Sequence, residues 1–294
     1  MLLKEIKTIF HQELDILYPE EEVNAFFYRL IEHYLKLERF VLVLQPNLTI
    51  SREEEQPLFE ALAELKLQKP LQYILGVAHF MDLELKVNKN VLIPRPETEE
   101  LVEWILNECL VERPSTERAG SRDLNILDVG TGSGCIAIAL ARKLPNAKVY
   151  AMDVSEGALE VAKSNAELNQ VEINFFRADI LKLELQPKPK PKFDIIVSNP
   201  PYVRELEKNE IKKNVKDYEP SLALFVPDDD ALLFYKAIVT SAEKYLMEKG
   251  SLYLEINQYL GKETKALLEA HNFLEIELRK DLFGNDRMLK GKLD

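Results

Sequence analysis

The sequence predicts an α/β protein in which a mostly parallel sheet follows a small all-helical domain. In the second half of the chain, short apolar runs alternate with segments of helical periodicity. This order arises when crossover helices join parallel strands. A glycine-rich turn follows the first of these runs, as it does at the ligand-binding edge of many such sheets. Residues 1–75 instead show only helical spacing of their apolar side chains, so we assign them to a separate domain.

Composition and charge restrict the class of partner. Of the 294 residues, 46% are hydrophobic and 30% are charged, which provides enough apolar material for a core. The formal net charge is −12, whereas a protein that holds phosphates non-specifically needs clustered Lys and Arg. The charge argues against direct nucleic-acid binding and favours a basic protein partner, which an acidic surface attracts.

Cysteine usage and the start of the chain indicate the compartment. Cys109 and Cys135 are the only cysteines, and two lone cysteines without a signal peptide indicate reduced thiols. With four histidines and no zinc-ligand spacing, we expect no metal site. Met1 opens directly into a helical pattern, and no apolar run is long enough to span a bilayer. We therefore expect a cytoplasmic protein with no membrane contact. Separately, we expect it to be a monomer.

Residues 1–75 form an acidic helical domain in this interpretation. Ser51 and Glu54 have the spacing of a capping box, which marks the start of one helix. From Met1 to Phe80 the chain has 13 acidic and 8 basic residues, a net charge of −5. Because this domain carries no catalytic signature, we expect it to grip a protein substrate. The helical spacing of its first segment is seen at Leu3, Ile6, Phe10 and Leu14.

A β-hairpin at residues 76–96 is expected to link the two domains. Ala78–Val87 alternates like a strand, Asn88–Asn90 supplies a turn, and Val91–Ile93 is predicted to be a second strand. Pro94–Glu97 then opens a helix with acidic residues in its first turn. The apolar face of this helix carries Leu101, Trp104 and Ile105.

Residues 97–294 carry the alternating strands and helices. Helices are expected at Ile136–Leu144 and through Ala158 and Val161, and surface connections at Glu112–Asp123 and Lys188–Pro191. The last two strands read as an antiparallel pair around a turn at Phe283–Asp286. The expected strands are Asn125–Val129, Lys148–Met152, Ile173–Phe176, Phe193–Val197, Leu252–Ile256, Leu274–Leu278 and Met288–Leu293.

The glycine-rich turn after the first strand indicates a cationic cofactor. Gly130, Gly132 and Gly134, with Thr131 and Ser133 between them, let the backbone approach a ligand closely. A dinucleotide-binding turn would have glycine where Cys135 stands. Asp128 beside the turn would also repel a pyrophosphate. S-adenosylmethionine, which carries a sulfonium and an ammonium group, fits this acidic turn better, although the same glycines could form a tight turn with no ligand.

Acidic residues end the next two strands. Asp153 follows the second strand, about twenty residues on, where a carboxylate can accept the protons of both ribose hydroxyls. It could instead cap the next helix, a role that Ser155 could share. Asp179 ends the third strand and could accept the exocyclic N–H of adenine, with Ile180 packing on the ring. An aspartate before an apolar residue is, however, also common in turns.

The fourth strand ends in a segment suited to methylating an amino group. Asn199 and Pro200 each precede a proline, so both are held in extended conformations. The side-chain oxygen of Asn199 and the carbonyl of Pro200 can accept the two protons of a planar –NH₂ group. They would thereby aim its weak lone pair at a methyl donor. We predict Asn199, Pro200 and Tyr202 as catalytic, with Tyr202 as an aromatic wall beside the two acceptors.

These motifs together resemble the N5-glutamine methyltransferases of peptide chain release factors, the PrmC/HemK family. The resemblance extends over essentially the whole chain. Asn199–Tyr202 alone is not decisive, since adenine-N6 and cytosine-N4 DNA methyltransferases use similar sequences. More discriminating are Gln72–Gly76, Val91–Glu103, Tyr218–Pro220 and Gly284–Arg287. The chain departs from the family pattern at Lys69 and at Val226–Asp230, and the second departure puts the shape of that loop in doubt.

The resemblance implies a Rossmann-like class I S-adenosylmethionine methyltransferase sheet of seven strands with the last antiparallel. It implies S-adenosyl-L-methionine as cofactor, held by Gly130–Gly134, Asp153, Ile180 and Asn199, to which the strand-end position adds Asp179. It implies that Asn199, Pro200, Pro201 and Tyr202 bind the substrate. It implies class 1 peptide chain release factors as substrates, methylated on the glutamine of a Gly-Gly-Gln motif. Arg95 and Glu97 either rigidify the linker or contact the pocket, and they are not assigned to the site.

Two other functions stay open at the level of the sequence. A nucleic-acid methyltransferase of the adenine-N6 type would need a basic track for phosphates and room for a flipped base. The acidic helical domain and the Val91–Glu103 segment argue against it. A binding protein that kept the fold but lost catalysis is the other, and the intact Asn199–Tyr202 segment opposes it.

Overall fold

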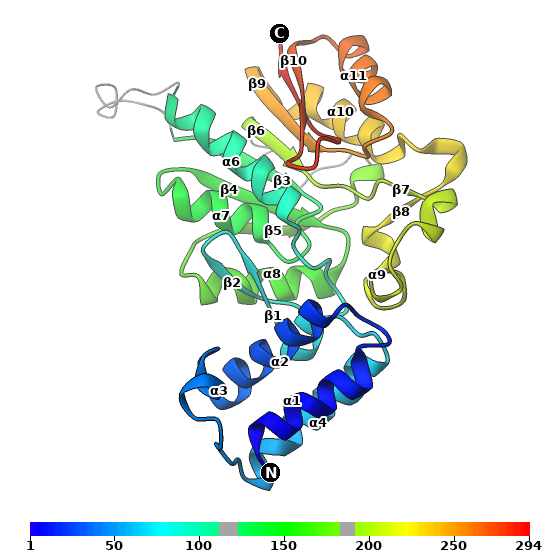
Figure 1. The fold of residues 1–294 in the computed structure, drawn as a ribbon. Coiled ribbons are helices and arrows are strands. Elements are labelled where there is room, and N and C mark those ends of the chain that lie inside the picture. Colours follow the sequence, from blue (N-terminus) through cyan, green and yellow to red (C-terminus); the bar gives the residue numbers. More distant parts are fainter. Residues whose placement is uncertain (112–122, 183–191) are drawn as a thin grey trace. The chain divides into compact units, whose positions relative to one another are not determined.

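The computed structural model describes residues 1–111, 123–182 and 192–294 (Figure 1). The chain divides into two compact units. The first comprises Met1–Gly76 with Lys212–Tyr218, and the second comprises Val77–Ile211 with Glu219–Asp294. The connections expected at Glu112–Asp123 and Lys188–Pro191 lie outside the described residues, Asp123 excepted.

The first unit is helical, as its apolar periodicity predicts. Leu3, Ile6, Phe10 and Leu14 are all fully buried in its core. The capping box is confirmed, since Glu54 N donates to Ser51 Oγ at 3.3 Å and Ser51 N donates to Glu54 Oε2 at 2.8 Å. Its helices are α1 (Leu3–Leu14), α2 (Glu20–Leu35), α3 (Val41–Leu44), α4 (Arg52–Lys66), α5 (Leu71–Leu75) and, from a distant part of the chain, α9 (Lys213–Tyr218).

The second unit contains the seven-stranded sheet that the resemblance implies. Its strand order is β10-β11-β9-β6-β3-β4-β5 (Figure 1). Strands β9, β6, β3, β4 and β5 are parallel, and the last strand, β11, pairs antiparallel with both β9 and β10. The strands are β3 (Asn125–Val129), β4 (Lys148–Asp153), β5 (Asn174–Arg177), β6 (Phe193–Ser198), β9 (Leu246–Glu255), β10 (Phe273–Lys280) and β11 (Asp286–Leu293).

Helices cover both faces of this sheet, because its central strands are apolar on both sides. Ile126 of β3 packs in the core under α6, α7 and α8. Its neighbour Leu127 packs in the opposite core, with α10 and α11. The predicted face of α6 is buried, with Leu101, Trp104 and Ile105 at most 2% exposed. These helices are α6 (Pro96–Val111), α7 (Cys135–Lys143), α8 (Glu156–Leu168), α10 (Leu233–Tyr245) and α11 (Gly261–Ala270).

The hairpin exists, but the predicted strand limits were wrong. It pairs β1 (Val77–Phe80) with β2 (Leu83–Lys86), and its turn lies at Met81 and Asp82. Met81 adopts a left-handed conformation with φ of 52°. The alternation of buried and exposed residues resumes after this two-residue turn, which hid the turn within one apparent strand. Val91–Ile93 lies outside any strand, and Val91 and Ile93 are buried by packing instead.

Short elements complete the described chain. Strands β7 and β8 form a small parallel pair after β6. None of the helices in the described ranges is long and apolar enough to cross a bilayer. The remaining elements are β7 (Val203–Arg204), β8 (Phe225–Val226) and the 3₁₀ turns η1 (Ile180–Lys182), η2 (Glu205–Asn209), η3 (Ser221–Ala223) and η4 (Asp228–Asp230).

The third glycine of the β3–α7 turn serves helix packing. Gly134 has φ of +84°, and a Cβ there would lie 3.0 Å from Ile138 Cδ1 and 3.2 Å from Ala162 Cβ. Ile138 lies in α7 and Ala162 in α8. A hydrogen atom at this position therefore lets α7 begin close against α8.

Asp128 lies beneath the same turn, in the core. Alternation along β3 turns its carboxyl group to the side of α7, and it is 0% exposed. Thr131 Oγ1 donates to Asp128 Oδ2 at 2.6 Å, which braces the turn. Burial raises the pKa of Asp128 from its ordinary 3.8 to about 7, and the nearby Asp153 carboxylate adds to the increase.

We expect Gly134→Ala to lower the free energy of unfolding by about 2–4 kcal/mol, combining left-handed backbone strain with overpacking. Gly284→Ala is the matched control, because Gly284 has φ of +86° but a Cβ there would meet nothing within 4 Å. Its cost should be about 1–2 kcal/mol, from backbone strain alone. Denaturant unfolding measures both, and equal losses would contradict the packing role of Gly134.

The Asp128 carboxyl group makes stability depend on pH. Because its pKa is raised on folding, its contribution to stability is complete below about pH 4 and is lost as the pH rises through about 7. In Asp128→Asn this loss is absent. Between pH 5 and 8 the free energy of unfolding of the variant should therefore rise relative to wild type, by up to about 3 kcal/mol. Parallel pH profiles from denaturant titrations would rule out this assignment.

Candidate active site

A pocket in the second unit lies at the carboxyl ends of β3, β4, β5 and β6, where an open parallel sheet gathers its loops. Gly134 and Tyr202 do not line it, and neither does Asp128, which the sequence placed beside a ligand. Strand alternation turns Asp128 into the core instead. The predicted site residues that line the pocket are Gly130, Thr131, Gly132, Ser133, Asp153, Asp179, Ile180, Asn199, Pro200 and Pro201.

The first two glycines of the turn keep space open. Gly130 and Gly132 have φ of +73° and +54°, and a Cβ at either would meet no atom within 4 Å. Since both line the pocket, side chains there would extend into the space that a ligand needs. Their roles differ from that of Gly134, whose missing side chain admits a neighbouring helix.

Asp153 joins the glycine turn to the start of α8. Its Oδ2 accepts a hydrogen bond from Gly132 N and its Oδ1 accepts one from Ser155 N, each at 2.9 Å. Burial raises the pKa of this carboxyl group. Each oxygen retains a further lone pair, so the side chain can accept ligand hydroxyls while it holds the turn. Ser155 caps α8 by accepting from Ala158 N at 3.2 Å.

Asp179 and Ile180 form another part of the pocket wall. Asp179 Oδ1 accepts from Leu181 N at 3.0 Å, and Oδ2 lies 3.3 Å from Lys182 Nζ. Ile180 is 9% exposed and belongs to the core beside α10. Its side chain thus offers a firm apolar surface at the position predicted to pack against a flat ring.

Asn199 is held by a hydroxyl group of α6. Its Nδ2 donates to Thr98 Oγ1 at 3.0 Å, and Thr98 Oγ1 donates to Glu255 Oε2 at 2.6 Å. Tyr202 reaches the same carboxylate, since its hydroxyl donates to Glu255 Oε1 at 3.0 Å. This arrangement leaves Asn199 Oδ1 to accept from a ligand. Ser198 fixes the strand end, donating from Oγ to Val129 O at 2.7 Å.

Thr98 and Glu255 were not predicted as site residues from the sequence. Both are almost fully buried, at 2% and 1% exposure. Burial raises the pKa of Glu255, against the opposing hydrogen bonds from Thr98 and Tyr202. The sequence signal that could have identified Glu255 is its position as a carboxylate among the apolar residues of Leu252–Ile256.

The Pro94–Glu97 segment contacts the pocket through one of its two charged residues. Arg95 lines the pocket and Glu97 does not. Arg95 Nη2 pairs with Glu219 Oε1 at 2.6 Å, and Ile93 N donates to Glu219 Oε2 at 3.1 Å. The Glu219 side chain is 1% exposed. This pair anchors the chain immediately after α9. Among the described residues, no three His, Cys, Asp or Glu side chains are grouped as a metal site requires.

Solved structures with related folds belong to the methyltransferases. The catalytic domain of hMettl16, in complex with MAT2A 3′UTR hairpin 6, has a TM-score of 0.52 at 16% identity over 81% of this chain and 82% of that one. The Thermus thermophilus 16S rRNA N2 G1207 methyltransferase, in complex with AdoMet and guanosine, has a TM-score of 0.50 at 19% identity over 74% and 50%. At these identities the similarity shows the fold, a class I methyltransferase sheet.

Sequence comparison is more specific. Residues 10–76 match the model of the PrmC N-terminal domain, and residues 107–216 match that of the methyltransferase small domain. The release factor glutamine methyltransferase of Bacteroides thetaiotaomicron is 40% identical over 98% of this chain and 99% of its own. That of Flavobacterium psychrophilum is 53% identical over 99% of both chains. This chain therefore belongs to the release factor glutamine methyltransferase family.

Proposed function

We propose that this protein transfers the methyl group of S-adenosyl-L-methionine to the side-chain amide nitrogen, N5, of the glutamine in the Gly-Gly-Gln motif of class 1 peptide chain release factors. Family membership supports the reaction and the substrate. One structural observation carries the chemistry. Asn199, on the pocket wall, has its amide nitrogen bonded to Thr98, so its oxygen is left to accept an amide proton of the substrate.

The residues of the pocket fit this cofactor. Gly130 and Gly132 leave space that a Cβ would fill. We assign the ribose hydroxyls to Asp153, the adenine amino group to Asp179 and the adenine ring to Ile180. When bound, S-adenosylmethionine supplies an electrophilic methyl group on a sulfonium.

The chain's contribution to the reaction is to orient a poor nucleophile. An amide nitrogen is weakly nucleophilic because its lone pair is delocalised into the carbonyl group. Asn199 Oδ1 and the Pro200 carbonyl would accept its two protons and favour a pyramidal nitrogen whose lone pair points at the methyl group. The following proline restricts the backbone of each residue, and Thr98 holds the Asn199 side chain. Both acceptors are therefore already ordered before the reaction. Pro201 completes the substrate wall, with Tyr202 behind it and bonded to Glu255. The nitrogen loses its proton as the N–C bond forms.

We assign substrate gripping to the helical domain at residues 1–75, with 76–96 as linker and 97–294 as the methyltransferase domain. The net charge of −5 over Met1–Phe80 suits a basic protein surface. A translation factor as substrate supports action in the cytoplasm. We propose that the protein acts as a monomer, without contacting nucleic acid directly.

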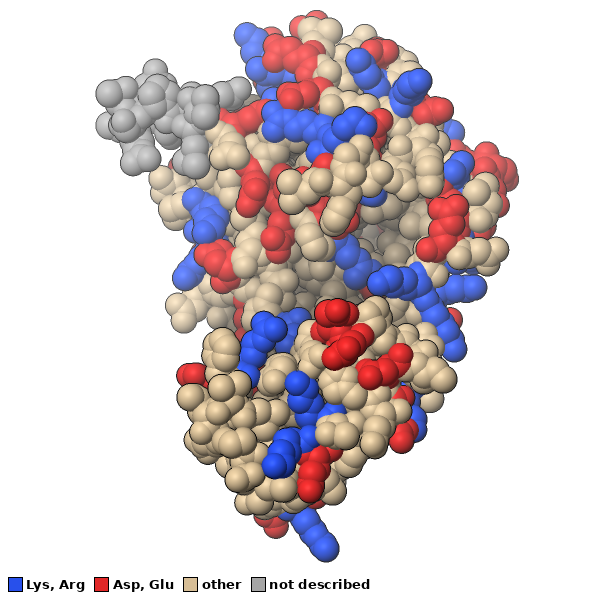
Figure 2. Space-filling view, viewed as in Figure 1, with Lys and Arg blue, Asp and Glu red and all other residues tan. Residues whose placement is uncertain are grey.

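A nucleic-acid methyltransferase is less well supported. Relatives that match nearly the whole chain are named release factor glutamine methyltransferases. On the face shown in Figure 2, Lys and Arg side chains are interspersed with Asp and Glu over most of the surface, apart from one group of Lys and Arg at the right. Transfer of a labelled methyl group to release factor, compared with DNA and RNA, distinguishes the two functions. Label in nucleic acid alone would overturn the proposal, and label nowhere would favour a binding protein without turnover.

Asp153→Ala should weaken binding of S-adenosylmethionine by about 1.5–3 kcal/mol, the effect of losing a charge-assisted acceptor. Calorimetry measures the affinity. Because Asp153 also holds Gly132 N, Asp153→Asn is the control that keeps one acceptor oxygen, and it should lose less. An unchanged affinity in Asp153→Ala would remove the ribose role.

Asn199→Ala should reduce kcat on release factor by roughly 10²–10³-fold, as expected when one preorganised polar group is removed. Asn199→Asp keeps an acceptor and should retain part of the activity. Cofactor affinity, measured by calorimetry, should change little in either variant, because Gly130, Gly132 and Asp153 supply most of the contacts. Near-normal turnover in Asn199→Ala would disprove the orienting mechanism. Loss of fold and cofactor binding together would make Asn199 structural.

A further inference from the structure

The side chains of Glu255, Thr98 and Asn199 form a hydrogen-bonded chain that ends at the pocket. They come from the end of β9, the first turn of α6 and the loop after β6. The Thr98–Glu255 link is 2.6 Å and the Asn199–Thr98 link is 3.0 Å. Thr98 and Asn199 line the pocket, whereas Glu255, which is buried, does not. Glu255 can therefore act on a ligand only through other residues.

The direction of this chain follows from what each group can donate. An ionised carboxylate only accepts hydrogen bonds, whereas a hydroxyl has one proton to donate. Thr98 gives its proton to Glu255, so it presents a lone pair to its other neighbour. The Asn199 amide must then turn its amino group toward Thr98 and its oxygen away. Without these hydrogen bonds, the Asn199 amide could adopt the flipped orientation, which has almost the same shape. Its N–H groups would then face the N–H groups of the substrate.

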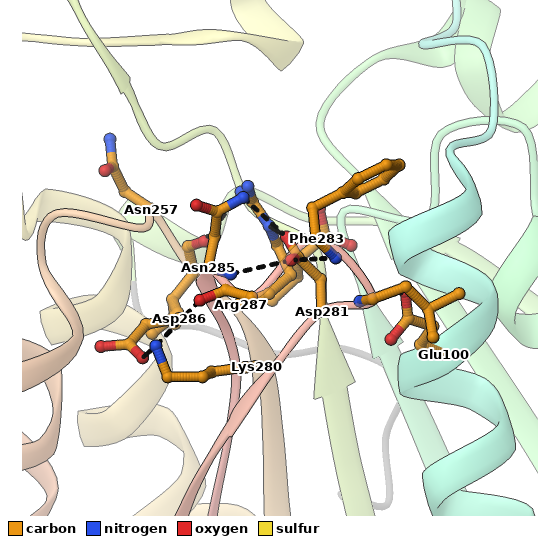
Figure 3. Close-up of polar contacts among 12 residues, drawn as sticks. Glu100, Asn257, Lys280, Asp281, Phe283, Asn285, Asp286 and Arg287 are labelled. Carbon is orange, nitrogen blue, oxygen red and sulfur yellow. Dashed lines mark hydrogen bonds and ion pairs between the residues drawn. The ribbon is translucent and has the colours of Figure 1, made fainter.

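Arg287 favours the charged form of Glu255. Its guanidinium donates from Nη1 to Tyr202 Oη at 3.4 Å, the hydroxyl that donates to Glu255. Burial raises the pKa of Glu255 and the nearby Glu97 adds to the increase, while Arg287 opposes both. Arg287 is itself anchored, with its Nε 3.2 Å from Asp281 Oδ2 (Figure 3).

The turn between β10 and β11 holds Asp281 in place. Asp281 Oδ1 accepts from Phe283 N at 3.0 Å and from Asn285 N at 2.9 Å, so its carboxylate closes the turn on itself (Figure 3). Its side chain is 0% exposed. This turn lies at the end of the sheet where β9 ends, and it thus positions the cation that faces Tyr202 and Glu255.

Asn257, two residues after the end of β9, holds the main chain that follows Pro200 and Pro201. Asn257 Nδ2 donates to Tyr202 O at 2.9 Å, and Asn257 N donates to Tyr235 Oη at 3.1 Å. Glu255 and Asn257 therefore hold Tyr202 by its hydroxyl and by its carbonyl. The loop that carries Asn199 is restrained on both sides.

We propose that Glu255 and Thr98 are positioning residues which set the orientation of the Asn199 amide, so that its oxygen and not its amino group faces the substrate. This inference rests on the proposed function, because it assigns a cause to the acceptor role of Asn199. It adds two residues that touch neither the transferred methyl group nor the reacting nitrogen.

The test compares two substitutions of Thr98. Thr98→Val removes the hydroxyl at nearly constant shape, and kcat on release factor should fall by at least about 10-fold. Thr98→Ser keeps the hydroxyl and should restore kcat to within a few-fold of wild type. The Kd for S-adenosylmethionine should stay within about twofold in both, because a positioning effect acts on kcat. Thr264→Val is the matched control. Thr264 is equally buried, but its hydroxyl bonds Leu260 O in α11, and kcat should not change.

Glu255→Gln provides an independent test at the carboxylate. The glutamine amide can donate to Thr98, whose own proton is then available to bond Asn199 Oδ1, so the amide direction is no longer fixed. Its kcat should fall as in Thr98→Val, with cofactor affinity retained. In the Asn199→Ala background, neither substitution should lower kcat further, since the group they orient is gone.

The outcomes separate this inference from the proposed function. If Asn199→Ala loses turnover while Thr98→Val and Glu255→Gln keep wild-type kcat, the positioning role is wrong and the proposed reaction stands. Additive losses in the double variants would also overturn it, because the residues would then act independently of Asn199. If Asn199→Ala itself keeps turnover, the proposed amide mechanism fails and this inference fails with it.

Discussion

The pairing register of the parallel strands is the constraint on which the site depends. Val129 of β3 pairs with Met152 of β4 on one side and with Ser198 of β6 on the other, and Ser198 pairs with Leu254 of β9. The residues that follow these partners are therefore aligned across the sheet, one strand spacing of about 4.8 Å apart. They are Gly130, Asp153, Asn199 and Glu255.

Each position in this row has a different task because its surroundings differ. At the β3 and β4 ends, Asp153 bonds Gly132 N, so the carboxylate and the open glycine turn form one cradle. At the β6 end, Asn199 presents an acceptor at the same pocket. At the β9 end, Glu255 lies behind the pocket and holds the loop that carries Asn199, through Thr98 and Tyr202. Under the proposed function, the cofactor turn and the acceptor at Asn199 share one base in the sheet, which would align a methyl donor and an amide without a moving catalytic group.

What the sequence could reveal is whatever depends on local pattern. The strand positions and the residues after Val129, Met152 and Ser198 were predictable, because each follows a buried strand and parallel strands end at the same edge. The hairpin limits were missed because alternation continues past the two-residue turn at Met81. Asp128 was misplaced because side chains alternate between the faces of a strand, a detail that the turn motif obscures.

Contacts between distant residues could not be predicted in the same way. Thr98 and Glu255 are 157 positions apart, and nothing in either local segment marks the other as its partner. The same holds for α9, which belongs to the helical unit although it lies within the methyltransferase part of the sequence. Such pairings are set by the packing of the whole chain.

The reaction proposed for this protein is methylation of a glutamine side chain in a release factor. Mass spectrometry of class 1 release factor purified from cells with and without this protein tests it most directly. We predict one added methyl group on the glutamine of the Gly-Gly-Gln motif when the protein is present, and its absence when the gene is deleted. An unmodified glutamine in both samples, or a methyl group on another residue, would contradict the claim.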